Sequence, residues 1–165
     1  MPLPNDLGDA NARYAAAWGD RASLAKEPAR KLAILACMDA RFDPLAALGL
    51  KEGDAHVIRN AGGVASDDAL RSLVVSNRLL GTTTAYVIGH TQCGMASFTN
   101  EELHARLEGE GVDARWLDFL PFRDVEESVA ASVRRLRETP LLPDDYSVEG
   151  FVFEVETGRL VPLEA

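Results

Sequence analysis

Apolar runs and helical repeats alternate along this 165-residue chain. Three short apolar runs bounded by turn residues predict buried strands, and an alternating segment near the C-terminus predicts a fourth. Between them, apolar residues recur every three or four positions behind Ser, Thr or Asp, which predicts capped amphipathic helices. The predicted strands are residues 32–37, 54–59, 84–89 and 147–155, and the predicted helices are residues 7–19, 44–48, 67–80, 100–109 and 124–138.

Strands that alternate with helices predict an α/β fold, here one domain over residues 1–165 with a mostly parallel sheet and helices on both faces. We expect the spatial order 2-1-3-4 for the four strands. Thr157-Gly158 resembles a two-residue turn, and it predicts an antiparallel edge strand at residues 159–162. The helix at residues 7–19 has no evident groove to fill, so it either packs on the sheet or reaches a partner chain.

Reactive side chains follow two of the predicted strands. Cys37, Asp39 and Arg41 come at the end of the first strand, and His90 and Cys93 come at the end of the third. In the order 2-1-3-4 these strands are adjacent, and parallel strands place their carboxyl ends on one edge of the sheet. Two cysteines and one histidine at that edge suit a zinc ion, and three protein ligands leave the open position of a catalytic site.

Each of these residues also has a plainer interpretation. A buried cysteine is usually a small core residue, and His90 by itself fits a core histidine. Asp39 and Arg41 could form a surface ion pair of little energetic value. Their grouping at two strand ends favours the metal site. If the chain stays extended there, Asp39, Arg41 and Cys37 share one side, and Arg41 would keep Asp39 ionised and off the metal.

Other polar features give weaker signals. Ala61, Gly62 and Gly63 follow the second strand, in a loop whose backbone N–H groups could cradle an anion. The loop lacks the spacing of nucleotide-binding glycine motifs. His56 lies inside the second strand, as a core residue or a neighbour of the site, and His104 lies on a polar helix and is expected to face solvent.

Composition narrows the classes of protein. The formal charge of -9 argues against a nucleic-acid partner, because phosphate backbones are bound by clustered Lys and Arg. The chain has only two cysteines, and in a reducing compartment such a pair is more often metal-bound or catalytic than disulfide-linked. No apolar run is long enough to cross a membrane, and the N-terminus lacks a signal-peptide pattern, so we expect a cytoplasmic protein.

Three segments together resemble the signature of the β-class carbonic anhydrases, in its compact prokaryotic branch. They are CMDAR at residues 37–41, RNAGG at residues 59–63 and GHTQCG at residues 89–94. The resemblance implies that Cys37, His90 and Cys93 bind zinc and that Asp39 and Arg41 form the catalytic dyad. It also implies a homodimer or a multiple of dimers with sites near the interface. In some members the aspartate closes the site as a fourth ligand.

The activity that the resemblance implies is the reversible hydration of carbon dioxide to bicarbonate by a zinc-bound hydroxide. Two alternatives stay open at the level of sequence. One is a hydrolase of carbonyl sulfide or carbon disulfide, linear molecules that the same site could attack. The other is a non-catalytic zinc-binding sensor or scaffold, in which Asp39 stays on the metal.

Overall fold

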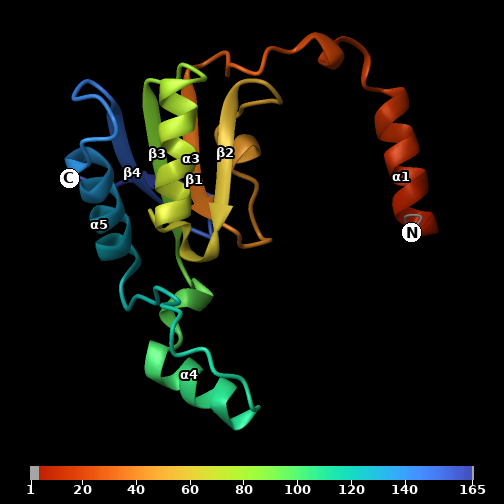
Figure 1. Ribbon diagram of the computed structural model, residues 1–165. Helices are drawn as coiled ribbons and strands as arrows, with labels where there is room; N and C mark the ends of the chain where they lie inside the picture. The colour runs from red at the N-terminus through yellow and green to blue at the C-terminus, as the bar shows by residue number, and fades with distance from the viewer. Residues whose placement is uncertain (1–3, 165) are drawn as a thin grey trace.

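The computed structural model describes residues 4–164 and is built on one five-stranded sheet in the order β2-β1-β3-β4-β5 (Figure 1). The first four strands in this order are parallel, and β5 runs antiparallel to β4. The predicted order and the antiparallel edge strand are confirmed. The strands are β1 (Leu32–Cys37), β2 (Ala55–Asn60), β3 (Thr84–His90), β4 (Ser147–Phe153) and β5 (Leu160–Pro162). The α-helices are α1 (Asn5–Ala16), α2 (Pro44–Ala47), α3 (Asp67–Arg78), α4 (Asn100–Gly109) and α5 (Val125–Glu138).

The two faces of the sheet are covered unequally. Right-handed crossovers in this strand order send β2-to-β3 and β3-to-β4 connections over the same face, so α3 and α5 lie side by side there (Figure 1). Leu35 of β1 points to that face and packs with Leu73 and Val133 of the two helices. Ile34 points to the opposite face, where the only covering helix within residues 4–164 is the four-residue α2.

Two segments extend away from the sheet (Figure 1). One is α1, which stands apart on the connecting residues 17–31, and none of its described side chains is buried. The other is the part of the chain that carries α4, between Met95 and Phe122, which themselves pack against the core. A capping box stabilises the start of α4, because Thr99 and Glu102 each accept a hydrogen bond from the other's backbone N–H. None of the helices within residues 4–164 combines the length and the apolar character needed to span a bilayer.

The connection from β4 to β5 differs from the prediction. Phe153 pairs with Leu160, so a loop of residues 154–159 replaces the expected two-residue turn at Thr157-Gly158. The Glu154 carbonyl accepts the N–H groups of both Thr157 and Gly158, at 3.2 and 2.8 Å, and this wider turn closes the hairpin. The loop therefore extends beyond the strands at the same end of the sheet as the carboxyl end of β4.

Gly63 is the tightest point between this sheet and the loop that follows β2. Its φ is +66°, and a Cβ there would lie 2.8 Å from the Cys37 nitrogen and 2.9 Å from the Ile88 oxygen. Both neighbours are backbone atoms of strands, which cannot move aside as a flexible side chain can. Only glycine fits, and the close approach places the loop directly against the end of β1.

We expect Gly63→Ala to lower the free energy of unfolding by about 2–4 kcal/mol, since backbone strain and overpacking add. Gly81→Ala is the matched control, because Gly81 also has a positive φ, +73°, but has nothing within 4 Å of a Cβ. It should cost only about 1 kcal/mol. Urea unfolding of the metal-free proteins measures both, and equal losses would contradict the steric explanation.

Candidate metal centre

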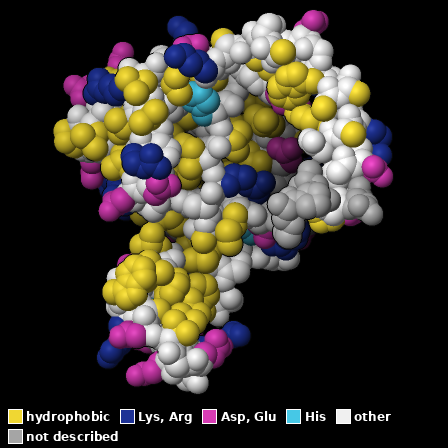
Figure 2. All heavy atoms as spheres, turned by 45° about the vertical axis from the view of Figure 1, so that its right-hand side comes forward, with side chains coloured by type: hydrophobic (Ala, Val, Ile, Leu, Met, Phe, Trp, Pro, Cys, Tyr) yellow, Lys and Arg dark blue, Asp and Glu magenta, His cyan; other side chains and the backbone are white. Residues whose placement is uncertain are grey.

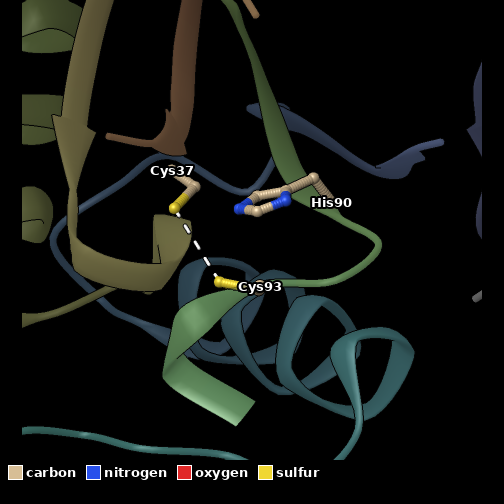
Figure 3. A group of neighbouring side chains, drawn as sticks. All are labelled: Cys37, His90 and Cys93. Carbon is tan, nitrogen blue, oxygen red and sulfur yellow. Dashed lines mark hydrogen bonds between the residues drawn. The ribbon is translucent and has the colours of Figure 1, made fainter. Parts of the chain in front are cut away.

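Three side chains with donor atoms suited to a metal converge beyond the carboxyl ends of β1 and β3 (Figure 3). Cys37 and His90 are the last residues of these strands, and Cys93 lies in the loop that follows β3. Their donor atoms all lie within 4.8 Å of one another, and all three residues are buried. The sulfurs are 3.9 Å apart, far beyond the ~2.05 Å of a disulfide. The convergence predicted from the strand order is therefore present.

The His90 ring is oriented to use Nε2 as an electron-pair donor. Its Nδ1 lies 2.8 Å from the Thr91 carbonyl oxygen, which can only accept, so the proton is on Nδ1. Nε2 points toward the two sulfurs and is the one buried side-chain nitrogen or oxygen of the described residues without a hydrogen-bond partner (Figure 3). An unsatisfied buried acceptor costs free energy, and a metal ion would satisfy it. Phe42 packs beside the ring, with centroids 5.8 Å apart.

The two thiols have different acidities. Burial would raise the pKa of Cys37, but the His90 ring, when it carries a second proton on Nε2, and the backbone N–H groups of Asp39 and Gly62 outweigh it and lower that pKa to about 7. Burial raises the pKa of Cys93 to about 11, and the negative charge of Cys37 acts in the same direction. One thiolate is thus available near neutral pH before any metal binds.

Asp39 and Arg41 form a bidentate pair beside these donors. Arg41 Nε donates to Asp39 Oδ1 at 2.9 Å, and Nη2 donates to Oδ2 at 2.8 Å. The chain does not stay extended after Cys37, because it turns at Ala40 and brings the Arg41 backbone N–H to Asp39 Oδ1 as well. These hydrogen bonds hold the pKa of Asp39 well below its usual range. Asp39 Oδ2 lies 3.6 Å from His90 Nε2.

The loop at Ala61, Gly62 and Gly63 forms a short 3-10 turn against the end of β1. The Gly62 N–H faces the Cys37 sulfur and helps to lower its pKa. The loop therefore favours the ionised form of Cys37. Binding of a substrate anion by the same loop stays a prediction.

Arg59 is a structural member of the site that the sequence analysis did not single out. Its Nε and Nη2 donate to the Cys37 carbonyl at 2.9 and 2.8 Å, and Nη2 also reaches the Asp39 carbonyl at 2.6 Å. Arg59 therefore fixes the backbone on both sides of Met38. Arg59 is the first residue of the segment RNAGG at residues 59–63, so the sequence did point to it. Its contacts with the Cys37 and Asp39 carbonyls follow only from the pairing of β1 with β2.

The other two histidines lie outside the group of donors. His56 contacts Ser76 Oγ of α3 through Nδ1 at 2.8 Å and the Lys26 carbonyl through Nε2 at 3.0 Å, so it has a packing role and does not neighbour the site. His104 is partly buried rather than fully solvent-facing, because its Nε2 lies 2.9 Å from the Leu117 carbonyl and its ring packs against Phe119. Leu117 and Phe119, in the segment that follows α4, cover the His104 side chain.

A family model described as carbonic anhydrase matches residues 32–120, the region that holds the three donors and the Asp39–Arg41 pair. The chain belongs to the β-class carbonic anhydrases, a family of enzymes. Among its relatives, β-carbonic anhydrase 1 of Mycobacterium tuberculosis is 42% identical over 161 residues, with 97% of each chain covered. The carbonic anhydrase from Glaciozyma antarctica is 46% identical, with a TM-score of 0.90, 99% of this chain covered and 100% of that chain. A carbon disulfide hydrolase of Acidithiobacillus thiooxidans is 35% identical, with 88% of this chain and 83% of the relative covered.

Titration of the metal-free protein should resolve two thiols by ultraviolet thiolate absorbance, one near pH 7 and one near pH 11. Cys37→Ser should remove the lower step, and Cys93→Ser should remove the upper one. His90→Ala should move the Cys37 step upward, because the ring beside the sulfur is lost. Two steps that both lie at the ordinary thiol value of about 8.5 would contradict this electrostatic arrangement.

Proposed function

We propose that this chain acts in the cytoplasm as a zinc-dependent enzyme that reversibly hydrates carbon dioxide to bicarbonate. Cys37, His90 and Cys93 bind the zinc, and Asp39 and Arg41 form the catalytic pair. The observation that supports this most directly is the pairing of two features at one strand edge. A buried group of two sulfurs and one ring nitrogen lies beside a carboxylate that an arginine keeps ionised.

The donor set fits zinc in both chemistry and size. Two sulfurs bound to one zinc at ~2.3 Å and tetrahedral angles lie about 3.8 Å apart, and these sulfurs are 3.9 Å apart. Thiolate and imidazole donors suit this ion, and three protein ligands leave a position for solvent. A zinc ion held there would supply Lewis acidity and lower the pKa of a bound water.

Asp39 contributes a hydrogen-bond acceptor that is charged throughout the neutral pH range. We assign it the orientation of the reacting water through Oδ2, the oxygen nearer His90. Because Arg41 occupies both carboxylate oxygens, it holds Asp39 away from the ligand position. This arrangement favours an enzyme over a sensor or scaffold in which Asp39 stays on the metal.

Apolar side chains close the loop next to Cys37. A Cβ at Gly62 would meet Phe122 at 2.9 Å, Val64 at 3.1 Å and Met95 at 3.4 Å. An apolar wall of this kind does not by itself discriminate between carbon dioxide, carbonyl sulfide and carbon disulfide, because all three are small, linear and apolar. The carbonic anhydrases of Mycobacterium tuberculosis and Glaciozyma antarctica, at 42% and 46% identity, are closer to this chain than the carbon disulfide hydrolases at 35% and 30%, which favours carbon dioxide.

Stopped-flow assays of the zinc-loaded protein with carbon dioxide, and in parallel with carbonyl sulfide and carbon disulfide, test the function. We expect carbon dioxide to be the preferred substrate. Asp39→Asn should keep zinc and lose about 10²-fold in kcat, the size of a general acid–base contribution. His90→Ala should lose both zinc and activity.

The chain contains its own control for the aspartate. Asp113-Ala114-Arg115 repeats the sequence of residues 39–41, and Arg115 binds Asp113 through Nε and Nη2 in the same way. It lies on the segment that carries α4, so Asp113→Asn should leave kcat unchanged. Preference for carbon disulfide would support the hydrolase, and zinc binding without turnover would support a sensor or scaffold. Full zinc occupancy of His90→Ala would refute the ligand set.

We further propose that the enzyme is a homodimer, or a multiple of dimers, joined through the α1 arm. Leu7, Tyr14 and Trp18 on and after this helix are 54%, 49% and 38% exposed, and Figure 2 shows a hollow between the arm and the body of the chain. The sparsely covered face of the sheet offers a cavity of about 270 Å³ beside Tyr86. A second copy can bury both surfaces, which an isolated chain leaves in water.

Tyr14→Ser with Trp18→Ser should convert the protein to monomers in analytical ultracentrifugation, because the arm loses its aromatic contacts. Leu79→Ser is the control. Leu79 is 73% exposed at the C-terminal end of α3 and should leave the mass unchanged. A monomeric wild type, or a dimer that survives the double substitution, would contradict docking through the arm.

A further inference from the structure

The loop between β4 and β5 contacts the metal-binding segment through Glu156. Its Oε2 accepts a hydrogen bond from Thr91 Oγ1 at 2.7 Å, and its Oε1 accepts one from Gln92 Nε2 at 2.6 Å. Thr91 and Gln92 are the two residues between His90 and Cys93. Both oxygens of one carboxylate are therefore bonded to the segment that carries two of the three proposed zinc ligands.

The backbone of this segment has a conformation that needs outside support. Gln92 has a φ of +54°, in the left-handed region that residues with a Cβ rarely adopt. Glu156 holds the side chain of Gln92 on one side, and the Val155 N–H donates to Thr91 Oγ1 at 3.0 Å on the other. The β4–β5 loop thus fixes the turn that brings Cys93 back toward Cys37.

Gln92 also connects Glu156 to the catalytic pair. Arg41 Nη2 donates to the Gln92 carbonyl at 3.0 Å, and Arg41 Nη1 lies 3.4 Å from Gln92 Oε1. The same Nη2 donates to Asp39 Oδ2 at 2.8 Å. The guanidinium is therefore held between Asp39 and Gln92, and Gln92 is held between Arg41 and Glu156.

We propose that Glu156 is a positioning residue of this enzyme. It fixes the turn between His90 and Cys93, and through Gln92 it fixes the orientation in which Arg41 holds Asp39. The inference rests on the proposed function of the site, because it gives the ligands and the dyad a common support. It assigns a function to a loop that lies more than sixty residues away in sequence.

A carboxylate suits this position because it offers two acceptors to two donors. The Thr91 hydroxyl and the Gln92 amide N–H each need an acceptor, and the planar fork of Glu156 supplies both at once. A glutamine would offer only one acceptor, and an aspartate is one methylene shorter. Glu156 is exposed, so its charge is screened, and a purely ionic role would weaken with salt.

The test compares zinc-loaded Glu156→Ala and Glu156→Gln with the matched pair Glu154→Ala and Glu154→Gln. Glu154 has the same charge in the same loop, but its carboxylate binds Thr157 instead of the ligand segment. For Glu156→Ala we expect kcat to fall about tenfold with KM within about twofold, and zinc release to a chelator to quicken about tenfold. For Glu156→Gln, kcat and the rate of zinc release should lie between those of the wild type and of Glu156→Ala, at both low and high salt. Both Glu154 variants should match the wild type.

A double-mutant cycle tests the connection through Gln92. If Glu156 acts on Arg41 through Gln92, Glu156→Ala should add little to the loss of kcat in Gln92→Ala. Additive losses, or an unchanged kcat or zinc release in Glu156→Ala, would overturn the proposal. A wild type without carbon dioxide hydration would instead refute the proposed function, and zinc release would then decide alone whether Glu156 supports the ligand turn.

Discussion

The parallel pairing of β1 with β3 is the constraint on which the candidate site depends. Their register sets Ala36 opposite Ile88, so the chain leaves both strands at the same level of the same edge. Cys37 and His90, one residue apart in register, then end adjacent strands that are ~4.8 Å apart, and their donor atoms come within reach of a single ion. The loop at Gly63 packs against both strand ends and leaves no room for a side chain.

The burial of this edge sets the chemistry of the donors. His90 is fully buried, with its free nitrogen turned toward two sulfurs that are themselves almost inaccessible. In such surroundings a bare thiolate or an unpaired acceptor is unfavourable, and a bound cation removes both penalties. The same segment 37–41 that supplies one donor also supplies the Asp39–Arg41 pair, and Arg59 holds its backbone from the neighbouring strand.

The repeated Asp-Ala-Arg sequence separates local from tertiary effects. At residues 39–41 and at residues 113–115, the arginine forms the same bidentate contact and lowers the pKa of the aspartate. This contact is a property of the local chain. Only the first pair lies beside two buried sulfurs, so its position in the fold makes it the candidate for catalysis.

The amino-acid pattern by itself determined the strand order, the antiparallel edge strand and the convergence of Cys37, His90 and Cys93. Hydrophobic periodicity marks each strand locally, and in the expected order 2-1-3-4 right-handed crossovers place the ends of the first and third strands together at one edge. The tertiary structure alone decided three other features: the wide β4–β5 loop, the carbonyl contacts of Arg59, and the contact of Glu156 with Gln92. The contacts of Arg59 and Glu156 depend on side chains that meet segments far away in sequence, and nothing in the local pattern around Glu156 indicates which loop it will touch. The width of the β4–β5 loop depends on the pairing of Phe153 with Leu160.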